Sequence, residues 1–264
     1  MRPNTPHFVV TPESAICHGG HFYAMSTIQD TVFGLYHMFV ASTRVTNTEH
    51  SEDAHLLLRR MVVYLHYVFV KRGSKVTDST SKPPPISHVP NLSTFEGALD
   101  LFMLCIIMEL GDLINPLAYK KTYRQARHHS LRVCTIHARG LSRDLRNWWD
   151  SCYIFLDPET RMLHTAESVF KNLLSQHLST LVFYKKMAEE NDVRGEVPEC
   201  TAKVLQSLLQ KYLPYALYSP CHRGFEWGGA MYVVQARAPG SSAYMRSWNS
   251  AFFPHDVLTI HCRP

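Results

Sequence analysis

The sequence predicts a mainly α-helical protein with a short β segment at its start, followed by a helical bundle. Apolar residues recur at three- and four-residue steps through most of the chain, as on one face of a helix. A short run of β-branched and aromatic residues near the start has the composition of a strand. With 264 residues, of which 45% are hydrophobic, the chain is long and apolar enough to bury a core.

Residues 1–23 are expected to hold the short β segment. Phe8-Val9-Val10-Thr11 has the composition of a strand, and Pro12 ends it. Residues 14–17 can begin a second strand before the break at Gly19-Gly20. The two strands could pair as a hairpin or lie along a sheet edge.

Two helices are predicted in residues 24–72. Ser26 and Gln29 are spaced as a capping box, so the first helix is expected to begin there and to run to residue 41. The second is expected from residue 51 to residue 72, with acidic residues in its first turn and basic residues in its last, which suits both ends of the helix dipole.

Residues 73–92 are expected to form an exposed linker. Gly, Ser, Thr, Lys and four prolines dominate this segment, and such a composition cannot build a core. It is the clearest boundary in the chain. A helical bundle is predicted after it, over residues 93–212.

The first helix of this bundle, from Ser93 to Gly111, is apolar almost all round and is therefore expected to be central and buried. An exposed helix that binds a partner is the alternative. Periodic apolar residues predict further helices over residues 165–190 and 198–212. Residues 213–264 are expected to form an irregular tail, with short strands at 231–234 and 257–260.

The charge and cysteine content limit the class of protein. The net charge is +5, from 27 Lys and Arg against 22 Asp and Glu, which suits an anionic partner without requiring one. Seven scattered cysteines suggest free thiols in a reducing compartment. Cys134 and His137 have metal-ligand spacing, but no second pair completes a zinc site. We expect an intracellular, soluble protein, because no apolar run is long enough to span a membrane and no secretory signal is present.

A basic stripe is predicted in the segment after Asn115-Pro116. Like charges at helical spacing repel one another, so an anionic partner would relieve a cost. The partner could be nucleic-acid phosphate or an acidic protein surface; the alternative is a solvated face of the bundle. The residues of this stripe are Lys120, Lys121, Arg124, Arg127 and Arg132, with His128 among them.

The start of the chain resembles the closing strands of a JmjC domain, the chromatin-associated branch of the iron(II)/2-oxoglutarate-dependent oxygenases. The resemblance covers about the first tenth of the chain and is closest to fungal JmjC proteins and to lysine demethylases with a trailing helical region. It rests on a proline-rich approach, a histidine before apolar strand residues and a threonine, and a Gly-Gly-polar-Phe turn. In this sequence these are Pro3, Pro6, His7, Val9, Thr11, Gly19, Gly20, His21 and Phe22.

The resemblance implies a jelly-roll barrel that holds iron(II) through two histidines and one carboxylate. His7 stands at the position of the last iron ligand, with Thr11 and His21 as supports for it. Without the motif, His7 would be interpreted as a partly buried histidine beside a strand. The co-substrate would be 2-oxoglutarate, whose decarboxylation accompanies hydroxylation of a C–H bond on a histone or another chromatin protein in the nucleus.

The other two ligands belong to a His-x-Asp or His-x-Glu pair that precedes the last histidine in the family, whereas only six residues precede His7. His50-Ser51-Glu52 has the spacing, but it follows His7 and lies at a helix start. The resemblance therefore implies the C-terminal part of a JmjC protein that does not bind iron(II) or 2-oxoglutarate alone. The alternative function is a non-enzymatic helical module that binds chromatin or another protein. Oligomeric state and substrate stay open.

Overall fold

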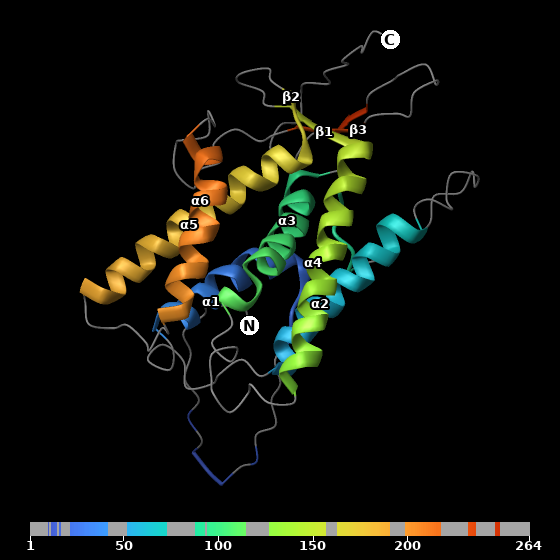
Figure 1. Ribbon diagram of the computed structural model, residues 1–264. Coiled ribbons are helices and arrows are strands. Elements are labelled where there is room, and N and C mark those ends of the chain that lie inside the picture. Colours follow the sequence, from blue (N-terminus) through green and yellow to red (C-terminus); the bar gives the residue numbers. More distant parts are fainter. Residues whose placement is uncertain are drawn as a thin grey trace.

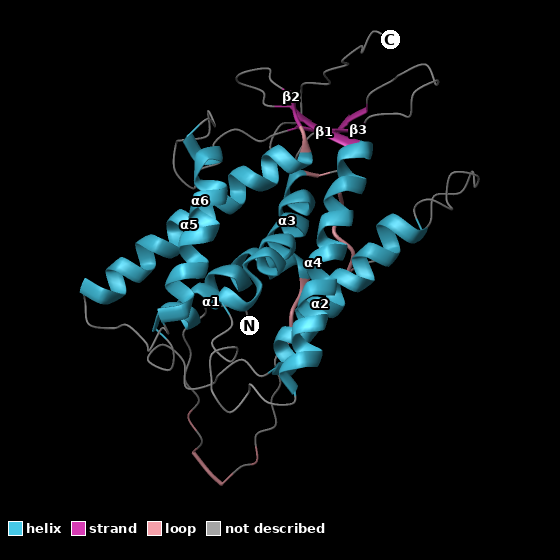
Figure 2. Ribbon diagram, viewed as in Figure 1, coloured by secondary structure: helices cyan, strands magenta, loops and turns pink. Residues whose placement is uncertain are grey.

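The computed structural model describes residues 10, 12–14, 16, 22–41, 52–72, 88–92, 94–114, 127–156, 163–190, 199–217, 232–235 and 246–248. Helices make up most of these residues, and a small antiparallel sheet lies at one end of them (Figure 2). This confirms the prediction of a mainly α-helical fold with a short β segment, but the observed sheet is formed by strands between residues 153 and 248 and not by the segment predicted at residues 1–23. The main helices are α1 (Ile28–Ala41), α2 (Glu52–His66), α3 (Phe95–Leu110), α4 (Arg127–Cys152), α5 (Ala166–Glu190) and α6 (Glu199–Leu217).

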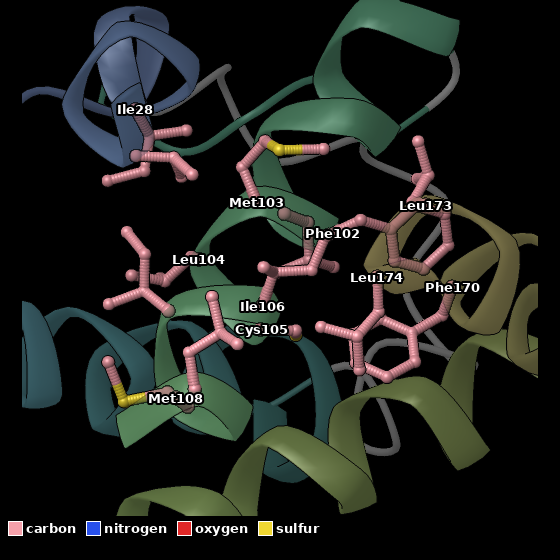
Figure 3. Close-up of a cluster of buried hydrophobic side chains, with 14 of the residues drawn as sticks. Ile28, Phe102, Met103, Leu104, Cys105, Ile106, Met108, Phe170, Leu173 and Leu174 are labelled. Atoms are coloured by element: carbon pink, nitrogen blue, oxygen red, sulfur yellow. The ribbon is translucent and has the colours of Figure 1, made fainter. Parts of the chain in front are cut away.

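Helix α3 is the centre of the molecule, as its all-round apolarity predicts. It contacts α1, α2, α4 and α5, and in Figure 1 it lies between the α5–α6 pair and the α2–α4 pair. Its residues 101–108 are all buried. Figure 3 shows Phe102, Leu104 and Ile106 surrounded by side chains of neighbouring helices. Burial on every side explains why the helix has almost no polar face.

The N-terminal cap of α3 lies one residue after the predicted start at Ser93, whereas the C-terminal cap lies at the predicted Gly111. The helix begins after Thr94, whose hydroxyl accepts a hydrogen bond from the Gly97 amide at 3.2 Å. It ends at Gly111, whose φ of 45° is a left-handed conformation that glycine adopts without a Cβ penalty. The N-cap residue is therefore Thr94 rather than Ser93.

The first predicted helix begins differently from the expectation. Met25–Thr27 form a 3-10 turn before α1, and no side chain caps that turn at Ala24. The Gln29 amide instead donates to the Asp100 carboxylate of α3 at 3.0 Å. The predicted capping glutamine therefore forms a tertiary hydrogen bond between α1 and α3.

The second predicted helix is confirmed over its length, but its last part is not α-helical. After α2 the backbone continues as a π-helical segment over Tyr67–Arg72. The Phe69 ring in this segment stacks on Trp148 of α4, with centroids 5.4 Å apart and planes 17° apart. Such wide turns are rare and are often found at functional sites.

The four strands form one antiparallel sheet in the order β2-β1-β3-β4, with bounds Tyr153–Leu156 (β1), Leu163–His164 (β2), Tyr232–Gln235 (β3) and Arg246–Trp248 (β4). Strand β1 follows α4 directly and lies inside the segment predicted to be purely helical, which is a correction. The predicted strand at 231–234 is confirmed as β3, whereas β4 was not predicted.

Other predicted strands fall on parts of the chain that the structure does not describe. These are the strand at residues 257–260 and most of the two predicted in residues 1–23. Of the first 23 residues, those described are Val10, Pro12–Ser14, Ile16, Phe22 and Tyr23, and none of these is in a strand.

Helices from both sides of the predicted linker share one hydrophobic core. Val62 and Leu65 of α2 belong to the same buried cluster as Phe102 of α3 and Leu174 of α5. Helices α1 and α2 therefore do not form a core of their own. The predicted boundaries between segments stay predictions. Among the helices that the structure describes, none has both the length and the apolar character needed to cross a membrane.

Candidate functional site

The iron site implied by the resemblance falls on residues outside the described part of the chain. His7, Thr11 and His21 all lie outside the described residues. Within the described part of the chain, no three His, Cys, Asp or Glu side chains are grouped so that they could hold a metal ion. No catalytic step through iron is therefore derived from this structure.

The residues that follow the predicted motif are packed on the helical core. Phe22 is 74% exposed, whereas Tyr23 packs against the core and Met25 is buried. Burial of the Tyr23 ring raises the pKa of its phenol well above the ordinary value. The chain thus enters the bundle at Tyr23, directly after Phe22 of the sequence motif.

The structure describes the backbone of only part of the predicted basic stripe. Lys120, Lys121 and Arg124 lie outside the described residues, and Arg127 and Arg132 belong to α4, but their side chains are not described. The stripe therefore stays a prediction.

A buried ionic cluster that sequence reasoning missed is centred on Arg146 of α4. Its Nε donates to Glu167 Oε2 of α5 at 3.1 Å, and its guanidinium carbon lies 3.8 Å from the centroid of the Phe170 ring. The Arg146 side chain is only 7% exposed, and that of Glu167 is 34% exposed. The charge is neutralised on one side by a carboxylate and covered on the other by an aromatic face.

Cys105 of α3 lies beside this cluster. Its thiol donates to the Ser142 carbonyl at 3.9 Å, and the Ser142 hydroxyl lies 3.5 Å from Arg146 Nη1. Burial raises the pKa of the Cys105 thiol, and the nearby Arg146 charge offsets only part of that rise. A buried, protonated thiol is not a nucleophile, so this cysteine does not make the cluster a catalytic site.

A second polar contact joins α6 to α3. The Tyr212 hydroxyl donates to Glu109 Oε1 at 2.6 Å, and Lys211 Nζ lies 3.3 Å from the same oxygen. Burial acts to raise the pKa of Glu109, but the Tyr212 hydrogen bond and the Lys211 charge outweigh it and hold the pKa below its ordinary value. The carboxylate is thus ionised where α6 meets α3.

The contact between α1 and α5 contains a third polar group. His177 of α5 is 3% exposed, and its ring lies 5.8 Å from that of Tyr36 and 5.7 Å from that of Phe33. Burial lowers the pKa of His177 to about 4. The imidazole is therefore neutral at pH 7 in the folded chain.

Together these groups hold helices in place and show no arrangement for chemistry on a substrate. The Arg146 cluster joins α3, α4 and α5, and the Glu109 cluster joins α6 to α3. The His177 ring packs against Phe33 and Tyr36 of α1. The only signal for Arg146 in the sequence is a cation close to large apolar residues, Leu145 and the Trp148-Trp149 pair. Such a position predicts burial with a partner but does not identify that partner.

Comparison with known proteins adds no assignment. No family model matches the chain, and searches of the curated proteins and of the solved structures found no match.

Proposed function

We propose that this chain contributes the last metal ligand and the helical support of an iron(II)/2-oxoglutarate-dependent oxygenase, and that it is not a complete enzyme by itself. The observation that carries the proposal is the JmjC-like pattern around His7, with the Gly19-Gly20 turn and Phe22 at the family's spacing. By the same resemblance, the substrate would be a lysine of a histone or another chromatin protein in the nucleus.

The fold supports this proposal in one respect. Tyr23 and Met25 pack into the core immediately after the motif. A strand that ends in a packed segment is held more firmly than one that ends in solvent, because the packed residues have little conformational freedom left. We infer that α1 and α3, which contact the Met25–Thr27 turn, serve as the base from which the metal-binding segment extends.

The ligand set defines what the chain can do alone. A single imidazole does not hold iron(II), and the other two ligands of a facial triad would have to be supplied from outside this sequence. When bound, iron(II) would activate O2, which is the oxidant, and 2-oxoglutarate would be oxidatively decarboxylated as the C–H bond of the substrate is hydroxylated. The part of His7 would be to bind the metal, and that of Thr11 and His21 to orient the imidazole.

The test compares anaerobic iron(II) binding, by titration calorimetry, in two samples: the 264-residue chain and the polypeptide as its source cells make it. We expect the chain alone to bind iron(II) no better than its His7→Ala variant. In the source-cell polypeptide, His7→Ala should abolish binding. His88→Ala, which removes an exposed histidine of the segment before α3, is the matched control and should leave binding unchanged. Equal binding by the source polypeptide and its His7→Ala variant would overturn the proposal.

A second candidate is a helical module that binds chromatin or another protein without catalysis. It is favoured by large apolar side chains that α4 and α5 leave exposed, such as Ile136 at 59%, Phe183 at 57% and Val133 at 51%. Scattered exposed apolar residues are common, but pairs at helical spacing give a partner a continuous surface.

This candidate is tested by binding to reconstituted nucleosomes. Charge reversal at Lys121, Arg124 and Arg127 should weaken binding if the predicted basic stripe contacts an anionic surface. Reversal at the exposed lysines 186 and 203 gives a control with changed charge elsewhere. If the stripe variant binds as tightly as the unmodified chain, the stripe has no such role.

A further inference from the structure

An exposed stripe runs along α2 into the π-helical segment. Its residues recur at steps of three and four and therefore lie on one face. The side chains of Tyr67, Val63 and Tyr64 are 58%, 44% and 38% exposed, and the basic residues near the two ends are exposed as well. We call this surface the α2 stripe; it consists of Arg60, Val63, Tyr64, Tyr67 and Lys71.

The opposite face of α2 is held firmly by the core. Leu58, Val62 and Leu65 are each 1% exposed or less, and Phe69 stacks on Trp148. The stripe is thus presented by a fixed helix rather than by a loop. The π-helical turns begin at Tyr67, the most exposed ring of the stripe, and such turns are often found at functional sites.

One of the two tyrosine rings is ordered by a neighbour. The Tyr64 hydroxyl and His88 Nε2 form a hydrogen bond of 2.9 Å, and the two rings lie 5.5 Å apart with 33° between their planes. His88 comes from the segment before α3 and is itself exposed. Three exposed rings, those of Tyr64, Tyr67 and His88, therefore belong to this surface.

The charges of the stripe have one sign. Arg60 and Lys71 are basic, and none of the five stripe residues is acidic. The carboxylate of Asp144, on α4, lies 3.6 Å from Nε2 of the buried His66, on the side of α2 that contacts α4. The surface thus combines cations near both ends with aromatic rings between them.

We propose that the α2 stripe binds a short segment of single-stranded nucleic acid. Bases stack on Tyr67 and on the Tyr64–His88 pair, and phosphates lie against Arg60 and Lys71. Eleven helical steps of about 1.5 Å separate the two cations, which gives roughly 16 Å. At about 3.4 Å per nucleotide of a stacked strand, this distance spans about five nucleotides.

An acidic peptide would satisfy the same cations but not the rings. A peptide that packs on a helix face mainly needs aliphatic contacts, and Val63 is the one aliphatic residue of the stripe. Stacked bases use each exposed ring and need no particular base sequence. The composition of the stripe therefore favours a nucleic acid. The inference is independent of the iron site proposed above.

The test is fluorescence anisotropy of the full chain with labelled oligothymidylate and oligouridylate of about 12 nucleotides. Tyr67→Ala should weaken binding about tenfold, whereas Tyr67→Phe, which keeps the ring, should bind as the unmodified chain does. Arg60→Gln with Lys71→Gln should weaken binding and lower the slope of log K against log salt by about 1.4. Circular dichroism checks that each variant is folded.

Matched controls remove similar groups elsewhere. Phe183→Ala removes an exposed ring of α5, and Lys186→Gln with Lys203→Gln removes two exposed cations of α5 and α6. Neither should change the affinity. The proposal is overturned if Tyr67→Ala binds as tightly as Phe183→Ala, or if polyglutamate displaces the oligonucleotide at equal charge concentration. The latter result would identify an acidic protein surface as the partner.

Discussion

Arg146 illustrates how a single side chain can link three helices. Its guanidinium carries a charge into an interior that disfavours ions, and Glu167 and the Phe170 ring compensate for the lost water. The aliphatic part of the arginine also fills space between α3, α4 and α5. Charge and volume can therefore be separated by substitution.

Arg146→Ala should lower the free energy of unfolding by about 3 kcal/mol, because it leaves a cavity and removes the partner of Glu167. Arg146→Met keeps most of the volume and should lose less. Urea unfolding followed by circular dichroism measures both. Lys171→Gln, which alters the partly exposed ion pair with the same carboxylate, should cost less than about 1 kcal/mol. An Arg146→Ala cost no larger than that of Lys171→Gln would contradict the importance of the buried cluster.

His177 should make the chain less stable in acid. Burial lowers its pKa from 6.5 to about 4, so between these values the unfolded chain binds a proton that the folded chain does not. Stability from this group is complete above pH 6.5 and falls by about 3 kcal/mol as the pH drops to about 4. Unfolding in urea at a series of pH values should show this slope, and His177→Gln should flatten it.

Asp100 should make the folded chain more stable in acid, which is opposite to the effect of His177. Burial raises the pKa of its carboxyl to about 6, and the Gln29 hydrogen bond opposes that rise. Its contribution to stability is complete below about pH 3.8 and is lost as the pH rises through 6. Asp100→Asn should therefore remain folded at pH 7 but lose stability more steeply on acidification than the unmodified chain. An unchanged pH profile in this variant would count against the raised pKa.

At the scale of helices, Gly97 and Gly140 lie in opposite surroundings: the first is closely packed and the second borders open space. A Cβ on Gly97, in the first turn of α3, would collide with the Asn91 carbonyl, whereas a Cβ on Gly140 of α4 meets nothing within 4 Å. Gly97→Ala should cost about 1–3 kcal/mol, because backbone must move. Gly140→Ala should gain about 0.5–1 kcal/mol, because alanine restricts the unfolded chain and favours the helix. Thermal melting of both variants should give melting temperatures that move in opposite directions.

The elements that the sequence predicts well are those with many periodic residues. The buried run of α3 and the long repeat of α5 leave one sensible structure, and both helices lie within two residues of their predicted bounds. Strand β1 was missed because Tyr153–Leu156 continue the apolar pattern of α4, and only pairing with β3 distinguishes a strand there. Strand β4 has three residues, too few for a pattern.

The site residues were harder to predict than the helices. Arg146 depends on Glu167 and Phe170, which lie on another helix, so its role appears only when the helices are packed. The stripe on α2 was hidden for a related reason. A tyrosine at helical spacing fits a core face as well as a solvent face. The burial of Leu58, Val62 and Leu65, together with the packing of Phe69 against Trp148, fixes which face is exposed.

At the scale of the whole molecule, the shared core predicts one cooperative transition. Leu65 of α2 and Leu174 of α5 come from opposite sides of residues 73–92, and both are at most 1% exposed in the same cluster. Leu65→Ala and Leu174→Ala should each cost about 3 kcal/mol and shift the entire unfolding curve. Circular dichroism and tryptophan fluorescence should give coincident midpoints in both variants. A separate early transition in Leu65→Ala would mean that α2 unfolds independently.

The pairing of β1 with β3 has a consequence for how the chain is made. Tyr153 pairs with Gln235, so this edge of β1 stays open during synthesis until α5, α6 and the residues after them have emerged. Contacts between such distant residues form slowly, because a long loop must close first. We expect the helices to fold before the sheet closes. A chain that stops before residue 232 should keep its helical core but expose an unpaired strand edge, and such edges promote aggregation.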